Sequence, residues 1–173
     1  MEPELKKRNC SLIGLSIDST PSHLAWIKNI YNSTGIKVPF PIISDLDMKI
    51  SRKYGMLAPN ISNTQTIRSV FFIDPEQKIR AILQYPMTNG RNTGEILRLL
   101  DALQLTDKES VSTPANWIPG SSVITPSPKT SEEMFSTPAN NNCIDWYLCY
   151  NSPIYTTTVS YTHLRAHETS LHL

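Results

Sequence analysis

Apolar residues in the N-terminal part of the chain form short, nearly continuous runs. Segments 11–18 (SLIGLSID) and 40–45 (FPIISD) have the pattern of strands that are buried on both faces. Segment 69–85 (SVFFIDPEQKIRAILQY) contains β-rich runs on both sides of a polar turn at 74–78, which predicts an antiparallel hairpin. We therefore expect single buried strands followed by a hairpin.

Between these runs, apolar residues recur at helical spacing. Leu24, Ile27 and Tyr31 fall on one face of a helix that we expect Thr20 to cap and Gly35 to end. The order β-α-β-α-β-β-α then predicts an α/β fold, with a central mixed sheet and flanking helices. The remaining helical segments are 46–56, closed by Gly55, and 93–105, with Ile96, Leu99, Leu100 and Leu103 at core spacing.

The sequence pattern changes after about Thr106. Periodicity disappears, and six of the 13 prolines follow, at positions 114, 119, 126, 128, 138 and 153. We predict a domain at 1–106 and an extended C-terminal arm at 107–151, with little core of its own. The polar tail at 152–173 resembles the translation of a sequencing adapter, and we exclude it from the fold.

Composition excludes several classes of function. A formal net charge of +1 gives no electrostatic reason to expect a nucleic-acid partner. No apolar run reaches the ~20 residues that cross a bilayer, so we expect no membrane association. The start of the chain has no apolar secretory segment, which predicts a cytoplasmic protein. Three cysteines do not make a disulfide framework in a chain of 173 residues.

Two of the cysteines lie close together near the end of the arm, in the stretch NNCIDWYLCYNS. Cys143 and Cys149 could be a metal clamp, a structural disulfide or thiols that take part in turnover. His163 and His167 follow, but the spacing C-x5-C-x13-H-x3-H misses that of a zinc finger, and we predict no metal. In the plain structural interpretation, Trp146 and Tyr147 dock the arm and the cysteines are small apolar residues.

Other candidate residues lie in the first domain. Cys10 stands just before a strand, where a thiol is usually packed and unreactive. A catalytic thiol needs a helix start or a fixed cation to lower its pKa, and we expect neither here. The nearby basic residues Lys6, Lys7 and Arg8 should form a solvated helix end. Arg68 precedes a strand and Arg91 precedes a helix. Each is either a surface residue or a guanidinium that faces a pocket, where it could stabilise a thiolate and an oxygen substrate.

Taken in order, the segments resemble the peroxiredoxins, specifically their one-cysteine-like subfamily. The matching stretches are LIGLSIDSTPSHLAWI, PFPIISDLDMKISRKYGM, TIRSVFFIDPEQKIRAI, YPMTNGRNTGEILRLLDALQLTD, VSTPANWIPGSSVI and CIDWYLCY. The resemblance implies a thioredoxin-like mixed sheet with flanking helices and an extended C-terminal arm.

The resemblance also implies a function. Peroxiredoxins reduce hydrogen peroxide and organic hydroperoxides through a cysteine sulfenic acid, without a cofactor, and an external dithiol restores them. Arg68 matches the family arginine that lowers the thiolate pKa and orients the peroxide, and Arg91 matches a supporting arginine. Cys143 and Cys149 match the paired cysteines of archaeal-type arms, with Cys149 as the better candidate for the resolving thiol. Intact members form homodimers or higher homo-oligomers.

The chain departs from the family at one motif. The attacking, or peroxidatic, cysteine of the family lies in Pro-x3-Thr/Ser-x2-Cys at a helix start, and the printed sequence contains no such motif. We interpret the chain as a peroxiredoxin without its N-terminal βα unit. We expect it to be inactive by itself, and either poorly soluble or reliant on a partner. The alternative is a non-catalytic thioredoxin-like scaffold or interaction module.

Overall fold

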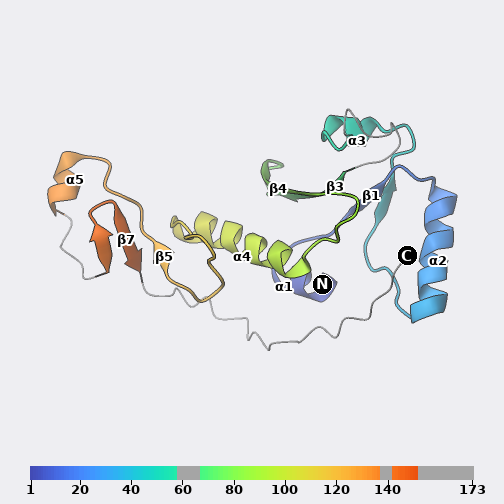
Figure 1. The fold of residues 1–173 in the computed structure, drawn as a ribbon, viewed down its shortest axis with the longest axis horizontal. Coiled ribbons are helices and arrows are strands. Elements are labelled where there is room, and N and C mark those ends of the chain that lie inside the picture. Colours follow the sequence, from blue (N-terminus) through green and yellow to red (C-terminus); the bar gives the residue numbers. More distant parts are fainter. Residues whose placement is uncertain (58–66, 137–141, 152–173) are drawn as a thin grey trace. The chain divides into compact units, whose positions relative to one another are not determined.

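A computed structural model of the chain describes residues 1–57, 67–136 and 142–151. The chain divides into two compact units, Met1–Gln104 and Leu105–Leu173, and α4 begins in the first and ends in the second. The elements, most of them labelled in Figure 1, are α1 (Glu2–Lys7), β1 (Gly14–Ser16), α2 (Thr20–Thr34), β2 (Ile42–Ser44), α3 (Lys49–Lys53), β3 (Arg68–Ile73), β4 (Ile79–Tyr85), α4 (Thr93–Glu109), β5 (Val123–Ile124), α5 (Ser131–Ser136), β6 (Cys143–Asp145) and β7 (Leu148–Asn151).

Strands β1 and β2 pair in parallel, and α2 crosses from one to the other and lies against β2. The cap of α2 is Ser19, one residue before the expected Thr20, because the Ser19 side chain accepts a hydrogen bond from the Ser22 N–H. The helix ends at Gly35, as predicted, with φ 71°. Glycine adopts this left-handed conformation without the steric cost of a Cβ atom.

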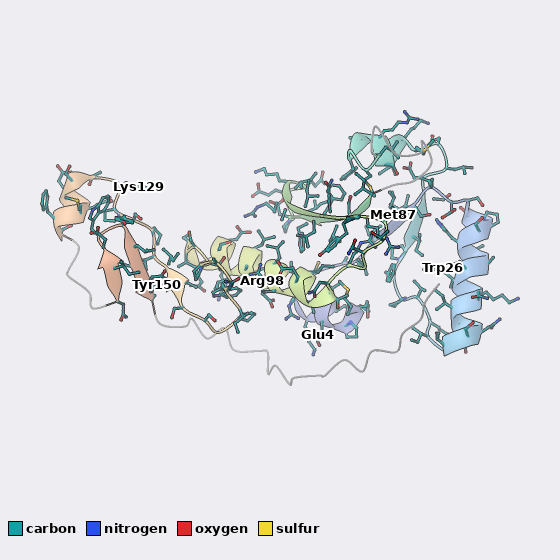
Figure 2. The ribbon with its side chains drawn as sticks, in the orientation of Figure 1. Glu4, Trp26, Met87, Arg98, Lys129 and Tyr150 are labelled. Atoms are coloured by element: carbon teal, nitrogen blue, oxygen red, sulfur yellow. A yellow bond between two sulfur atoms is a disulfide. The ribbon has the colours of Figure 1, made fainter. Side chains whose placement is uncertain are left out.

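The apolar face predicted for α2 is only partly buried. Leu24 is 62% exposed and Tyr31 is 47% exposed, whereas His23 is buried. Ile27 is half-buried, and Trp26, labelled on α2 in Figure 2, is 53% exposed. The face of α2 that the structure covers is therefore displaced from the one that the apolar spacing indicated.

Strands β3 and β4 form the predicted antiparallel hairpin, which continues into α4. Arg68 lies opposite Tyr85, and a register shift follows Phe72. Asp74 closes the turn, because its carboxylate accepts from the Lys78 N–H and its own N–H donates to the Lys78 carbonyl. The core cluster of this unit joins α1, β3 and α4 through Leu5, Phe72, Ile96 and Leu100, with Leu99 and Leu103 packed against it.

Arg8 corrects one expectation. We expected it in a solvated helix end with Lys6 and Lys7, and those two lysines are indeed exposed. Arg8 instead is 7% exposed, and its Nε and Nη2 atoms donate to the Asp101 carboxylate at 2.5 and 3.0 Å. A guanidinium can be buried when a carboxylate that accepts two of its hydrogen bonds replaces the water molecules around it. Arg8 therefore links α1 to α4.

The expected order of elements is present, but the described strands of the first unit do not join in one sheet. The parallel pair β1–β2 and the antiparallel pair β3–β4 supply both kinds of pairing that a mixed sheet contains. Within the described residues they form separate two-stranded ladders. Strands pair only where their edges face each other at about 4.8 Å, and no described strand lies hydrogen-bonded between them.

The second unit contains more regular structure than the lost periodicity indicated. Strands β5, β7 and β6 form a three-stranded antiparallel sheet in that order. Before it, Trp117 is 4% exposed, and its indole N–H donates to the Ser121 carbonyl. Val123 is fully buried. The tail at 152–173, including His163 and His167, lies outside the described residues, and no described helix has the length and apolar character of a membrane span.

Candidate functional site

Arg68 stands at the first position of β3, where the hairpin meets the loop that leads to α4. Its strand position is fixed by pairing with Tyr85, the last residue of β4. The loop turns at once, because the Asn89 N–H donates to the Pro86 carbonyl. Arg68 Nη1 in turn approaches the Asn89 carbonyl at 3.4 Å. The guanidinium of Arg68 is therefore held beside the β4–α4 loop.

Arg91 lies on the same loop, just before α4. The helix start is set by Asn92, whose side-chain oxygen accepts from the Glu95 N–H at 3.1 Å. Desolvation lowers the pKa of Arg91, and the charge of Arg68 lowers it further. The contact of Arg68 with the Asn89 carbonyl places its guanidinium at the loop that carries Arg91 two residues later, and the effect of its charge on Arg91 agrees with this placement. The structure thus brings the two arginines to one loop.

This arginine pair has the chemistry of a site for oxygen ligands. Within the described residues, no carboxylate forms an ion pair with Arg68 or Arg91, while other arginines such as Arg8 and Arg98 pair with acidic side chains. Two nearby guanidinium groups repel each other unless an anion or a polar oxygen lies between them. Guanidinium N–H groups are fixed donors that suit a thiolate or a peroxide oxygen.

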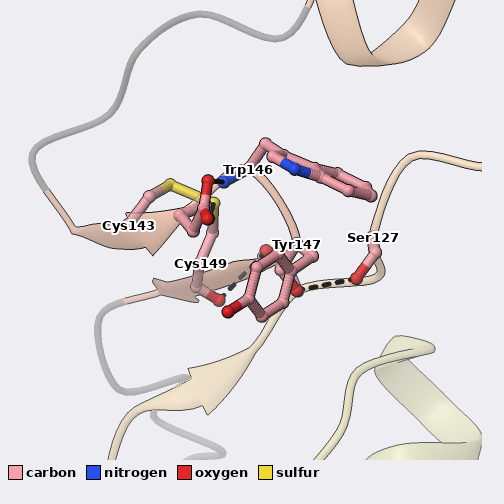
Figure 3. Close-up of a disulfide and its surroundings, with 7 residues drawn as sticks. Ser127, Cys143, Trp146, Tyr147 and Cys149 are labelled. Carbon is pink, nitrogen blue, oxygen red and sulfur yellow. Dashed lines mark hydrogen bonds between the residues drawn. A yellow bond between two sulfur atoms is a disulfide. The ribbon is translucent and has the colours of Figure 1, made fainter. Parts of the chain in front are cut away.

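The two cysteines of the arm form a disulfide in the structure. Cys143 on β6 lies opposite Cys149 on β7, and their Cα atoms are 4.0 Å apart (Figure 3). Of the possibilities that the sequence left open, the geometry shows a disulfide within one hairpin. Sulfur in this state is not a nucleophile, so either cysteine could act as a resolving thiol only after reduction.

Trp146 and Tyr147 form the turn of this hairpin. Their rings meet edge to face, with centroids 5.5 Å apart and an interplanar angle of 81°. About half of each side chain is exposed, at 50% and 51%. They pack on each other, and their expected role as docking residues of the arm stays a prediction.

Cys10 has the surroundings of an inert thiol. It packs against the core cluster, and burial raises its pKa, which is the opposite of what a catalytic thiol needs. The zinc alternative for the arm cannot be followed to its histidines, because His163 and His167 lie outside the described residues. Among the residues that the structure does describe, no group of three or more potential metal ligands is found.

Sequence reasoning missed the hydroxyl groups beside the cysteine hairpin. Thr125 and Ser127 both donate to carbonyls of the segment that contains Cys149, at 3.2 and 2.8 Å. Their only signal in the sequence is the alternation Thr-Pro-Ser-Pro, which is typical of loop composition. Such a pattern gives no indication of which carbonyls the hydroxyls will meet.

Comparison with known proteins identifies the family. Residues 1–82 match the AhpC/TSA family, and residues 102–137 match the C-terminal domain of 1-Cys peroxiredoxin. The chain is 54% identical to Peroxiredoxin 2 of Caldanaerobacter subterraneus over 83% of its own length, and it spans 66% of that relative. It is 46% identical to a peroxiredoxin of Aquifex aeolicus, covering 84% of this chain and 71% of that one.

A solved structure of yeast mitochondrial 1-Cys peroxiredoxin agrees with the sequence relatives. It superposes with a TM-score of 0.75 at 44% identity, covering 87% of this chain and 74% of that one. This likeness confirms the predicted thioredoxin-like fold class, and the relatives confirm the resemblance drawn from the sequence. The chain belongs to the peroxiredoxin family.

Proposed function

We propose that this chain forms part of a thiol peroxidase that reduces hydrogen peroxide and organic hydroperoxides, and that Arg68 and Arg91 supply its positive charge. The supporting observation is the arginine pair, which has no carboxylate partner among the described residues. In a peroxiredoxin, a thiolate and a peroxide oxygen are the groups that such a pair would stabilise.

The reaction needs a thiolate that attacks one peroxide oxygen. The sulfur–oxygen bond forms, the oxygen–oxygen bond breaks, and water or an alcohol leaves while the cysteine becomes a sulfenic acid. A resolving thiol then displaces water from the sulfenic acid and forms a disulfide. We propose Cys149, or its partner Cys143, for this second step.

The arm would enter this cycle only in its reduced state, because the structure joins Cys143 to Cys149. An external dithiol must therefore open this bond first. In the yeast mitochondrial 1-Cys peroxiredoxin, thiol resolution proceeds via glutathione and thioredoxin systems. This supports a thioredoxin-like reductant here. A cytoplasmic homodimer or larger homo-oligomer as the working form belongs to the proposal and does not follow from that relative.

The second candidate function is a non-catalytic thioredoxin-like scaffold. One observation favours it, since the printed sequence contains no Pro-x3-Thr/Ser-x2-Cys motif and its single cysteine in the first unit is a packed thiol with a raised pKa. A scaffold would keep the fold and the arm but would not need the arginine pair.

The two candidates differ in what an added peroxidatic segment would do. We would assay peroxide consumption by the chain itself, and by the chain joined before Met1 to the segment of a relative that carries its Pro-x3-Thr-x2-Cys motif. We expect no turnover by the chain itself and clear turnover by the joined protein. Arg68→Lys should lower the turnover of the joined protein by about 100-fold, because the lysine loses the fixed pair of donors.

Arg80→Lys is the matched control. Arg80 lies on the neighbouring strand β4 and forms its ion pair with Asp74, so its replacement should leave turnover unchanged. Equal activity of the Arg68→Lys and Arg80→Lys proteins would refute the role of the arginine pair. Cys10-dependent peroxide consumption by the chain itself would refute the assignment of the attacking thiol to the motif.

A further inference from the structure

The segment at 125–127 runs beside β7 and bonds to the part of the hairpin that carries Cys149. The backbone N–H and the side-chain hydroxyl of Thr125 both donate to the Cys149 carbonyl, at 3.0 and 3.2 Å. The Ser127 hydroxyl donates to the Tyr147 carbonyl at 2.8 Å (Figure 3). These contacts extend the β5–β7 ladder beyond the last paired strand residues.

Both side-chain contacts fall on carbonyls in one short stretch of the hairpin. Cys149 lies in β7 and Tyr147 lies in the turn just before it, and the carbonyls of both residues accept hydrogen bonds from the same partner segment. In that segment Thr125 and Ser127 alternate with Pro126 and Pro128, which have no N–H to donate and so cannot pair with a strand on the other side. The Ser127 side chain supplies a donor to the Tyr147 carbonyl beyond the end of the β5–β7 ladder.

Besides its disulfide, the hairpin is held by the short pairing of β7 with β5 and of β6 with β7. Strand β6 has a register irregularity between Cys143 and Asp145, and Ile144 is 75% exposed. A two-stranded pairing by itself is marginally stable in water, and the β5–β7 ladder pairs only two residues of each strand. If the disulfide opens, the bonds from residues 125 and 127 add to this ladder in keeping β7 in its place.

We propose that Thr125 and Ser127 are positioning residues for the cysteine pair. They keep β7 in register when the disulfide is reduced, so that the Cys149 thiol stays opposite Cys143 and the disulfide re-forms readily. The inference rests on the proposed function in one respect, which is that the pair opens and closes during turnover.

Thiol–disulfide exchange between the Cys143–Cys149 disulfide and glutathione tests the inference. It is a two-electron reaction in which the glutathione concentration is known. A glutathione thiolate attacks one sulfur, forming a mixed disulfide and releasing the other cysteine as a thiolate, which takes a proton. A second glutathione thiolate then releases glutathione disulfide and the second cysteine. The equilibrium constant of this exchange measures how strongly the folded arm holds the two thiols together.

The experiment equilibrates the full chain with mixtures of glutathione and glutathione disulfide, in a Cys10→Ser background that removes the free thiol. Acid quenching, alkylation and mass spectrometry give the fraction of closed disulfide. Ser127→Ala should lower the closing equilibrium constant about five-fold, which is the loss of one hydrogen bond and corresponds to a rise of about 20 mV in potential. Thr125→Val, which keeps the backbone donor, should act in the same direction.

Ser136→Ala is the matched control, because the Ser136 hydroxyl donates to a carbonyl of α5 and not to the hairpin. Ser127→Thr keeps a hydroxyl and should restore the equilibrium constant. The inference fails if Ser127→Ala and Ser136→Ala give the same constant, or if Ser127→Thr does not differ from Ser127→Ala. Because no peroxide is used, this result is independent of whether the peroxidase proposal holds.

Discussion

The first unit and the cysteine hairpin of the second unit are stabilised in different ways. The first is held by buried apolar side chains on α1, β3 and α4, supported by the buried Arg8–Asp101 pair. The hairpin has largely exposed side chains at its turn, and is held by a disulfide, by the short pairing of β7 with β5 and by donors from residues 125 and 127. One region depends on burial, which a redox change does not alter, and the other depends on a bond that reduction breaks.

This difference has a consequence for the two candidate sites. The arginine pair takes its position from strand β3 and from the loop that precedes α4, elements that the core cluster holds. The cysteine pair takes its position from the hairpin that it crosslinks. We therefore expect the redox state of the cysteines to change the arm while the strand that carries Arg68 stays in place.

The largest expected effect comes from the core of the first unit. Leu100→Ala removes a side chain that is 9% exposed and leaves a cavity in the core cluster, so we expect the free energy of unfolding to fall by about 2–5 kcal/mol. Urea unfolding followed by circular dichroism measures the change. Leu24→Ala, at a site that is 62% exposed, should change stability by no more than about 0.5 kcal/mol. Similar losses for both variants would contradict the assigned core.

A smaller, local effect is expected in the hairpin. Cys143→Ser removes a crosslink between residues six apart, and closing such a short loop stabilises the folded state by about 2 kcal/mol. Hydrogen exchange should show faster exchange of the Tyr150 amide, which donates to the Asn142 carbonyl. Amides of β3 and β4 should keep their rates. Faster exchange in both regions would show that the units are not independently stabilised.

The smallest expected effect depends on pH. Asp45 is buried, and although burial raises its pKa, hydrogen bonds from the Ile50 and Ser51 N–H groups lower it, so that the net pKa is below its usual value. A depressed pKa in the folded state adds stability above the unfolded value of about 4, and this stability is lost as pH falls through the folded pKa. Asp45→Asn should therefore narrow the difference in stability between pH 6 and pH 3.

Urea midpoints measured across that range test this expectation. Glu4 and Glu95 also have lowered pKa values and are present in both proteins, so their contributions cancel in the comparison. The charge of Asp45 raises the pKa of Asp47, so the comparison reports Asp45 together with its effect on Asp47. An unchanged pH dependence in Asp45→Asn would show that the carboxylate does not support the start of α3.

Local signals predicted the elements of the first unit well. The hairpin turn at 74–78, the stop of α2 at Gly35 and the core spacing of α4 all depend on residues that are neighbours in the sequence. The exposed face of α2 was not predicted, because helical spacing shows which residues share a face but not what covers that face. The sheet of the arm was not predicted, because its strands are short and prolines lie in the segments next to them.

The sequence by itself determined the family, the order of the elements and the types of residue that could do chemistry, since these follow from local pattern and ordered motifs. Only the tertiary structure decided that Arg68 reaches the loop that carries Arg91, that Arg8 is buried against Asp101, and that Cys143 faces Cys149. Arg8 and Asp101 are 93 residues apart, and chain spacing does not show whether such groups meet. Their meeting depends on how strands and helices pack, which is a property of the whole fold.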